Sequence, residues 1–216
     1  MPLKLKQKDV IVFEGDSLTR RDMSVNRDDW AYLRMMNWHE SWTNTVEELL
    51  FSWHPELELK FINAAVGGSN SKDLLRRLDT HVLQFNPTWI IVTVGTNDSH
   101  YIPLDEFAIA IKEYVTRVGA NGNTKVLFLG GFQVAEKFIG ETTEFDAKLP
   151  YYHALKTIAA ESGHYYLDIG KVIVKKSKLL FQQSDAHTVY GDGLHFNKLG
   201  NTIIAGEVLK AFGIVR

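Results

Sequence analysis

Four short stretches of the sequence combine small residues with side chains that can carry out chemistry. They are Gly15-Asp16-Ser17-Leu18, Asn63-Ala64-Ala65-Val66-Gly67-Gly68, Gly95-Thr96-Asn97-Asp98 and Asp192-Gly193-Leu194-His195. Each stretch alone has an ordinary explanation, because Gly allows a turn and Asp, Ser or Asn caps a helix. Together they supply a hydroxyl, an imidazole, carboxylates and amide groups. These are the groups with which an enzyme attacks a carbonyl carbon.

Ser17, His195 and Asp192 are the residue types of nucleophilic catalysis. A serine hydroxyl is a poor nucleophile until a neighbouring base takes its proton, and histidine suits that task near neutral pH. An acid that accepts a hydrogen bond from the other imidazole nitrogen fixes the tautomer and stabilises the imidazolium. Asp192 and His195 are three residues apart, so one loop could present both.

The remaining residues of these stretches could stabilise the charge that such an attack creates. An oxyanion needs donors that already point at it, and the Ser17 N–H, the Gly68 N–H and the Asn97 side-chain amide could supply three. Glycine at position 68 would let the backbone approach the substrate closely. We expect Asp16 and Asp98 to support their loops by accepting hydrogen bonds from nearby backbone N–H groups.

The elements that must position these residues follow from the hydrophobic pattern. Five apolar runs with little polar alternation predict strands that are covered on both faces: Val10–Phe13, Leu57–Ile62, Trp89–Val94, Lys125–Leu129 and Tyr165–Ile169. Amphipathic segments between them predict helices over Thr43–Trp53, Ser71–Gln84, Leu104–Val118, Pro150–Ser162 and Lys198–Phe212. We expect Ser71 to begin the second helix, Pro150 to lie in the first turn of the fourth and Asn197 to cap the last.

This alternation predicts a three-layer α/β/α fold around a parallel sheet of about five strands. Ligands of such sheets bind beyond the carboxyl ends of the strands, where three of the four stretches lie. No repeat, low-complexity tract or linker interrupts the chain, so we predict a single domain over residues 1–216. Three segments do not fit the alternation and are expected to be long excursions: residues 20–44, 132–149 and 172–190.

Composition excludes several classes of function. The formal net charge of −2 offers no basic field for nucleic acid, and the absence of Cys excludes disulfides, thiolate zinc sites and a Cys nucleophile. No apolar run is long enough to span a bilayer. The first residues lack the apolar core of a secretory signal, so we expect a cytoplasmic location. The sequence does not indicate an oligomeric state.

The four stretches, in this order, resemble the SGNH (GDSL-type) hydrolase superfamily, and the resemblance extends from Gly15 to the last helix. The family's second-block glycine lies five residues after an Asn, which selects Gly68 over Gly67 because Asn63 ends the second strand. The resemblance implies a flavodoxin-like fold, a triad of Ser17, His195 and Asp192, and an oxyanion hole from Ser17, Gly68 and Asn97. It implies no metal and no organic cofactor.

The resemblance implies hydrolysis of an ester or thioester through an acyl-enzyme, but it does not select the substrate. We expect a small-molecule ester with a short acyl group, and a carbohydrate O-acetylesterase is one candidate. The Trp and Tyr residues of the 20–44 excursion could stack on sugar faces, and Arg20 and Arg21 could bind an anionic group. No broad apolar lid is evident, which disfavours long-chain lipids.

Three other interpretations stay open. The first is a lysophospholipase or thioesterase. The second is a non-catalytic flavodoxin-like binding module, although the sequence has neither a phosphate-binding Gly-x-x-x-x-Gly-Lys-Ser/Thr motif nor a dinucleotide-binding Gly-x-Gly-x-x-Gly motif. The third is a metal-dependent phosphoesterase that uses Asp16, Asp98, Asp192 and His195.

Overall fold

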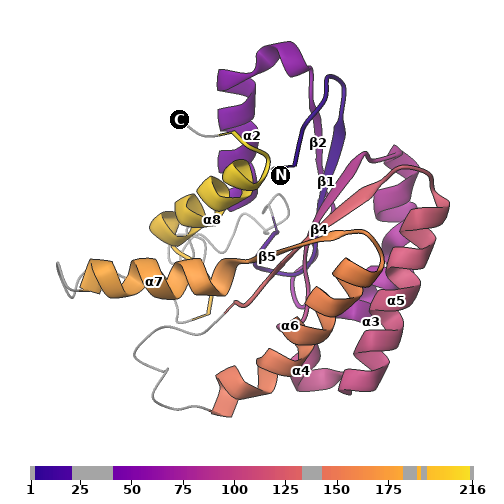
Figure 1. Cartoon of the computed structure of the whole chain (residues 1–216), viewed down its shortest axis with the longest axis vertical. Coiled ribbons are helices and arrows are strands. Elements are labelled where there is room, and N and C mark those ends of the chain that lie inside the picture. The colour runs from indigo at the N-terminus through magenta and orange to yellow at the C-terminus, as the bar shows by residue number, and fades with distance from the viewer. Residues whose placement is uncertain (1–2, 21–40, 133–142, 182–188, 191–193, 215–216) are drawn as a thin grey trace, which may run out of the picture.

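The protein is built on a five-stranded parallel sheet. The computed structural model describes residues 3–20, 41–132, 143–181, 189–190 and 194–214 (Figure 1). The strands lie in the order β2-β1-β3-β4-β5, and each neighbouring pair is parallel. They are β1 (Val10–Glu14), β2 (Lys60–Asn63), β3 (Trp89–Thr93), β4 (Lys125–Gly130) and β5 (Tyr165–Asp168). The predicted parallel five-stranded sheet is confirmed, and its strand order is that of flavodoxin.

Helices cover both faces of the sheet, which gives the predicted three layers (Figure 1). One face is covered by α2 (Trp42–Trp53), α7 (Ile169–Phe181) and α8 (Lys198–Ala211). The other is covered by α3 (Ser71–Arg77), α5 (Leu104–Ala120) and α6 (Thr143–Glu161). Shorter elements are η2 (Pro55–Leu57), η3 (Leu78–Val82), η4 (Leu83–Phe85) and α4 (Asp98–Tyr101).

The apolar strands are explained by two separate cores, one on each face. In β3 all five residues are buried. Ile90 and Val92 pack with the core under α3, α5 and α6, whereas Trp89 and Ile91 pack with the core under α2 and α8. Successive side chains of a strand point to opposite faces, so a strand covered on both sides must be apolar at every position.

The helix expected over 71–84 is shorter than predicted. Helix α3 ends at Arg77, and a π-helical turn (η3) and a 3₁₀ turn (η4) follow it. Its N-cap is Asn70 rather than Ser71, because the Asn70 side chain accepts hydrogen bonds from the Lys72 and Asp73 N–H groups. The Asp73 carboxylate accepts the Asn70 N–H in return, which completes a capping box.

Two other helix predictions were wrong. Helix α6 begins at Thr143, so Pro150 lies inside the helix instead of in its first turn, at the cost of one backbone hydrogen bond. The segment expected as an excursion over 172–190 is helical up to Phe181, as part of α7. Ile169, Ile173 and Ser177 are its buried residues at four-residue spacing. Because the sequence pattern places Ile169 in the preceding strand, the four-residue spacing that indicates a helix lacks its first residue.

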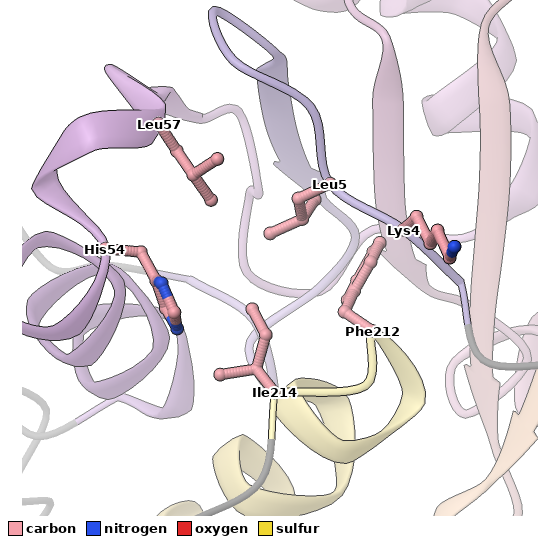
Figure 2. Close-up of a pocket in the computed structure, with 6 residues that line it drawn as sticks. All are labelled: Lys4, Leu5, His54, Leu57, Phe212 and Ile214. Carbon is pink, nitrogen blue, oxygen red and sulfur yellow. The ribbon is translucent and has the colours of Figure 1, made fainter.

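An apolar hollow lies between the start of the chain and the ends of α2 and α8 (Figure 2). Leu5, Leu57 and Ile214 point into it, while the amine of Lys4 points away (Figure 2). A hydrogen bond from the Leu3 N–H to the Ala211 carbonyl, 2.8 Å long, ties the two segments together beside it. None of the residues that line the hollow belongs to the four polar stretches, so it is separate from the predicted chemistry.

In the described part of the chain, no helix combines the length and the apolar character that crossing a bilayer requires.

Gly15 directly follows the last residue of β1, and the chain there has no room for a side chain. Its φ of +137° lies in a region that L side chains rarely adopt, and a Cβ atom would overlap the hydroxyl and the carbonyl of Thr93 on β3. The first strand therefore stops on a glycine for a steric reason, and the close approach places the following turn directly against β3.

We expect Gly15→Ala to lower the free energy of unfolding by about 3 kcal/mol, because it adds both backbone strain and a clash with Thr93. The matched control is Gly206→Ala on α8, where a Cβ atom would meet nothing within 4 Å. That substitution should raise stability by about 0.5–1 kcal/mol, since Ala favours helix over Gly. Urea denaturation of both variants measures the difference. Equal stability for the two would contradict the packing argument.

Candidate active site

The loops after β1, β2 and β3 meet at one edge of the sheet. Strand β1 pairs with β2 on one side and with β3 on the other, so all three carboxyl ends converge there. In this strand order β2 is added on one side of β1 and β3 on the other, and such a topological switch point is where these sheets bind ligands. Three of the four polar stretches therefore surround one site.

His195, the last residue of the fourth stretch, reaches the same site from the far end of the chain. The Nε2 atom of His195 lies 2.9 Å from the Oγ atom of Ser17, although 178 residues separate them. Packing and hydrogen bonds fix the residue that follows His195. Phe196 is buried, and its carbonyl accepts a hydrogen bond from the Asn201 side chain. Asn197 caps α8 through the Gly200 N–H, as predicted. This distance is within hydrogen-bonding reach, as the predicted pairing of Ser17 with His195 requires.

Asp192 lies outside the described residues, so its part in a triad stays a prediction.

The turn that carries Ser17 is held by Asp16, which is buried. Its Oδ1 atom accepts hydrogen bonds from the Leu18 N–H (2.9 Å) and from the Thr93 hydroxyl (3.1 Å). The Trp42 indole donates to the Leu18 carbonyl at 2.8 Å. Burial raises the pKa of Asp16 to about 6, against the opposing effect of these hydrogen bonds. These contacts tie the turn to β3 and to α2, and they are of the kind expected for Asp16.

The second and third loops bring two of the expected oxyanion donors together. Gly68 has a φ of +76°, which favours glycine, and a Cβ atom there would meet nothing within 4 Å. The Asn97 side-chain amide donates to the Ser69 carbonyl at 2.9 Å. An amide has two N–H groups, so one orients the side chain and the other can serve a ligand. Gly68, after β2, and Asn97, after β3, thus come together at the end of β1, which lies between those two strands.

Asp98 connects the same two loops. Its carboxylate is buried and accepts hydrogen bonds from the Ser71 N–H (2.9 Å) and the Gly95 N–H (3.2 Å). Burial raises the pKa of Asp98. Because these oxygens bind backbone donors, the contacts made by Asp98 suit a support for the loop better than a ligand of an ion.

The absence of a side chain at Gly67 leaves room for the guanidinium of Arg20 beside Ser17. A Cβ atom at Gly67 would lie 3.3 Å from a guanidinium nitrogen of Arg20 and 3.9 Å from the Cβ atom of Ser17. The side chain of Arg20 therefore crosses the second loop next to Ser17. Arg21 and the rest of the aromatic excursion up to residue 40 lie outside the described residues.

A buried ionic group beneath these loops was not predicted. Glu14, fully buried at the end of β1, lies against Arg77 of α3, with 3.4 Å between Oε1 and Nε. The Tyr114 hydroxyl of α5 donates a hydrogen bond to the same carboxylate. A Glu within a strand that is apolar on both faces was the available signal, since a charge in such a place requires a partner. The sequence pattern did not identify that partner.

A polar groove leads away from the second loop. Its lining combines Val66 to Ser69 with side chains of α3 and η3, namely Asp73, Arg76, Arg77, Thr80 and His81. It has a volume of about 550 Å³ and begins at Gly68, one of the expected oxyanion donors. A substrate bound at Ser17 could extend into it.

Within the described ranges, no group of three or more His, Asp or Glu side chains lies close enough to hold a metal ion.

Comparison with known proteins decides the family. The model of the GDSL-like lipase/acylhydrolase family matches residues 13–203, which is most of the chain. The chain belongs to this family. Membership makes it a serine hydrolase of the esterase type and accounts for the order of the four stretches. A single domain over residues 1–216 and a cytoplasmic location stay predictions.

Solved structures share the fold of this GDSL-family chain at low sequence identity. A GDSL-like protein of Parabacteroides merdae is 19% identical over 100% of both chains, with a TM-score of 0.80. Axe2, an acetylxylan esterase from Geobacillus stearothermophilus, is 19% identical over 99% of both chains, with a TM-score of 0.79. LAE5, described as an alpha/beta hydrolase enzyme from the metagenome of Lake Arreo, is 18% identical over 98% of both, with a TM-score of 0.80. No curated protein matches significantly.

The buried Glu14 gives the stability of the hydrolase a distinctive pH dependence. Burial raises its pKa to about 7 from an ordinary value near 4.5, despite the Tyr114 hydrogen bond and the Arg77 charge, which oppose the shift. Between these two values the unfolded chain has lost the proton and the folded protein still holds it. The contribution of Glu14 to stability is therefore present in acid and declines as the pH rises to about 7.

We expect Glu14→Gln, which cannot titrate, to gain about 2–3 kcal/mol in unfolding free energy relative to wild type between pH 5 and pH 8. Urea denaturation at a series of pH values measures the difference. The exposed Glu106→Gln serves as the control and should show no such trend. A constant difference between wild type and Glu14→Gln across this range would contradict the assignment.

Proposed function

We propose that the protein is a serine esterase that cleaves small, short-acyl esters through an acyl-enzyme on Ser17. The observation that carries the proposal is the 2.9 Å contact between His195 Nε2 and Ser17 Oγ, which is hydrogen-bonding distance for proton transfer. In Axe2, variants with a Ser, a His or an Asp replaced by Ala are described as catalytic mutants, and there too the Asp lies three residues before the His. Asp192 and His195 have the same spacing.

The proposed reaction follows from these positions. Ser17 Oγ attacks the ester carbonyl while His195 takes its proton, and Asp192 orients the imidazole. The negative oxygen that forms is stabilised by the N–H groups of Ser17 and Gly68 and by the Asn97 amide. His195 then protonates the departing alcohol as the C–O bond breaks. Water, deprotonated by His195, releases the acid and restores the Ser17 hydroxyl.

Acetylated carbohydrate is the substrate class that we propose to test first. The groove next to Gly68 is lined by charged and hydroxyl-bearing side chains, including Asp73, Arg76 and Thr80, which suit hydrogen bonds to sugar hydroxyls. The activity described for Axe2, an acetylxylan esterase, points to the same class. A thioesterase or lysophospholipase remains the second candidate, since the same mechanism serves both.

Family membership disfavours the other two interpretations of the sequence. A non-catalytic binding module has no need for a His at hydrogen-bonding distance from the Ser. For a metal-dependent phosphoesterase, Asp16 and Asp98 would have to bind the ion, but both carboxylates already accept hydrogen bonds from backbone N–H groups. Sensitivity to a chelator distinguishes that mechanism directly.

We expect Ser17→Ala to lower kcat on p-nitrophenyl acetate by at least about 10³-fold, because the nucleophile is lost. His195→Gln should lose a similar factor, and treatment with EDTA should change neither wild type nor variant. The control is Ser162→Ala, an exposed Ser after the end of α6, which should keep full activity. Unchanged turnover in Ser17→Ala would refute the nucleophile, and loss of activity in EDTA would favour the metal-dependent mechanism.

The acyl preference is measured with the same variants on p-nitrophenyl acetate, butyrate and octanoate, followed by acetylated xylo-oligosaccharides. We expect kcat/KM to be highest on acetate and to fall with chain length. Faster cleavage of octanoate than of acetate would replace the carbohydrate proposal with the lipase-type alternative.

We expect Asn97→Ala to lower kcat by about 10²–10³-fold with little change in KM, since an oxyanion donor acts in the transition state and not on the bound ester. Asn121→Ala, at the C-cap of α5, is the matched control and should retain wild-type kinetics. Steady-state kinetics on p-nitrophenyl acetate provide the measurement. A rise in KM alone would show that Asn97 binds the substrate instead.

A further inference from the structure

Arg77 is a buried cation whose nitrogen atoms point at two loops of the active site. Only 9% of its side chain is exposed. One terminal nitrogen donates to the Ser69 Oγ atom at 2.7 Å, and the other donates to the Gly15 carbonyl at 2.8 Å. Its Nε atom faces the buried carboxylate of Glu14. A single planar guanidinium therefore binds the loop after β1 and the loop after β2 at the same time.

The atoms that Arg77 binds are junctions between these loops. The Gly15 carbonyl also accepts the Val66 N–H at 3.0 Å, so it joins the first loop to the second. The Ser69 hydroxyl donates to the Val66 carbonyl at 2.7 Å. The Ser69 carbonyl accepts the side-chain amide of Asn97, which joins the second loop to the third.

All three proposed oxyanion donors are next to these junctions. Gly15 lies two residues before Ser17, Gly68 directly precedes Ser69, and Asn97 binds Ser69 itself. Donors of an oxyanion hole must lie within about 2.7–3.1 Å of one point. Because Arg77 binds both Gly15 and Ser69, it fixes the distance between them. It therefore also fixes the distance between the donors that flank these two residues.

The type of side chain supports a geometric role. Burying an ion pair such as Glu14 with Arg77 is costly, and apolar side chains of similar size often give equal or greater stability. A guanidinium offers five N–H donors in a rigid plane, so it can hold three acceptors at fixed angles, whereas an ammonium is a point charge on a flexible stem. Stability alone does not require a buried guanidinium at this position. Holding two loops at a fixed distance does require a side chain with several rigidly oriented donors.

We propose that Arg77 is a positioning residue that holds the nucleophile loop and the oxyanion loop in register. The proposal rests on the proposed function, because it assumes that Ser17 attacks and that Gly68 and Asn97 stabilise the oxyanion. Arg77 itself touches no reacting atom. It acts through the Gly15 carbonyl and the Ser69 hydroxyl.

The test uses three variants in the full-length chain. Arg77→Lys keeps the charge opposite Glu14 but loses the planar fork. Arg77→Met removes the charge, and Ser69→Ala removes one of the acceptors of Arg77 together with the hydrogen bond to the Val66 carbonyl. The matched control is Arg117→Met, because Arg117 donates to the Leu75 carbonyl of α3 and pairs with Asp79 without contact to either loop. Far-ultraviolet circular dichroism and thermal melting determine the folded fraction of each variant.

We expect kcat on p-nitrophenyl acetate, per folded molecule, to fall about 10–100-fold in Arg77→Lys and Arg77→Met, with KM changed less than about threefold. The inhibition constant of a short alkyl boronic acid should rise by a similar factor. Its adduct with Ser17 places a negative tetrahedral oxygen in the oxyanion hole and so reports on the transition state. Ser69→Ala should show a smaller loss of the same kind, and the double variant Arg77→Met/Ser69→Ala should lose no more than Arg77→Met alone.

A purely structural role gives a different pattern. In that case Arg77→Lys or Ser69→Ala would melt at a lower temperature but keep the wild-type kcat and the wild-type boronate affinity per folded molecule, which would overturn the proposal. Recovery of full kcat by Arg77→Lys would also overturn it, because charge alone would then suffice. If Arg77→Met does not fold, Arg77→Lys and Ser69→Ala still decide the question. Retained activity in Ser17→Ala is a separate result that would refute the proposed function instead.

Discussion

The close contact between Gly15 and Thr93 is the constraint on which the rest of the site depends. Strands β1 and β3 pair up to Glu14, and the missing side chain of Gly15 lets the chain turn directly against β3. The Thr93 hydroxyl then binds Asp16 and lies 2.7 Å from the hydroxyl of Thr19, so both sides of Ser17 are fixed to the neighbouring strand. The position of Ser17, the proposed nucleophile, is therefore set by the pairing of β1 with β3.

Charged side chains lie at two depths at this edge of the sheet. Asp16 accepts hydrogen bonds from the Leu18 N–H and the Thr93 hydroxyl, and Asp98 accepts them from the N–H groups of Ser71 and Gly95. Beneath them, the buried carboxyl group of Glu14 lies against the guanidinium of Arg77. Protein interiors tolerate such groups only where hydrogen bonds and opposite charges compensate for lost hydration. The proposed site therefore lies over buried polar and charged side chains, although the strands that end there are otherwise apolar.

The sequence predicted best where periodicity and local chemistry agree. Strand β3 is buried at every position, and Asn197 caps α8 through contacts within one turn of helix. Prediction failed where partners are distant in sequence. Arg77 and Glu14 are 63 residues apart, and no spacing connects them. The order of the four stretches predicted that Ser17 and His195 share a site, but only the fold supplies their distance. Asp192 and most of the 20–44 segment lie outside the described residues.

The side chain of Arg20 across Gly67 has a consequence for how the reaction ends. In the proposed reaction the ester is neutral, whereas the acid that Ser17 would release is an anion at neutral pH. A guanidinium next to the nucleophile attracts that anion more strongly than it attracted the substrate. Carboxylate should therefore be the last species to leave the site, and the enzyme should slow as its own acid product accumulates. The positive charge of Arg20 could help to bind a substrate. The same charge would then lower the turnover rate when the acid product is concentrated.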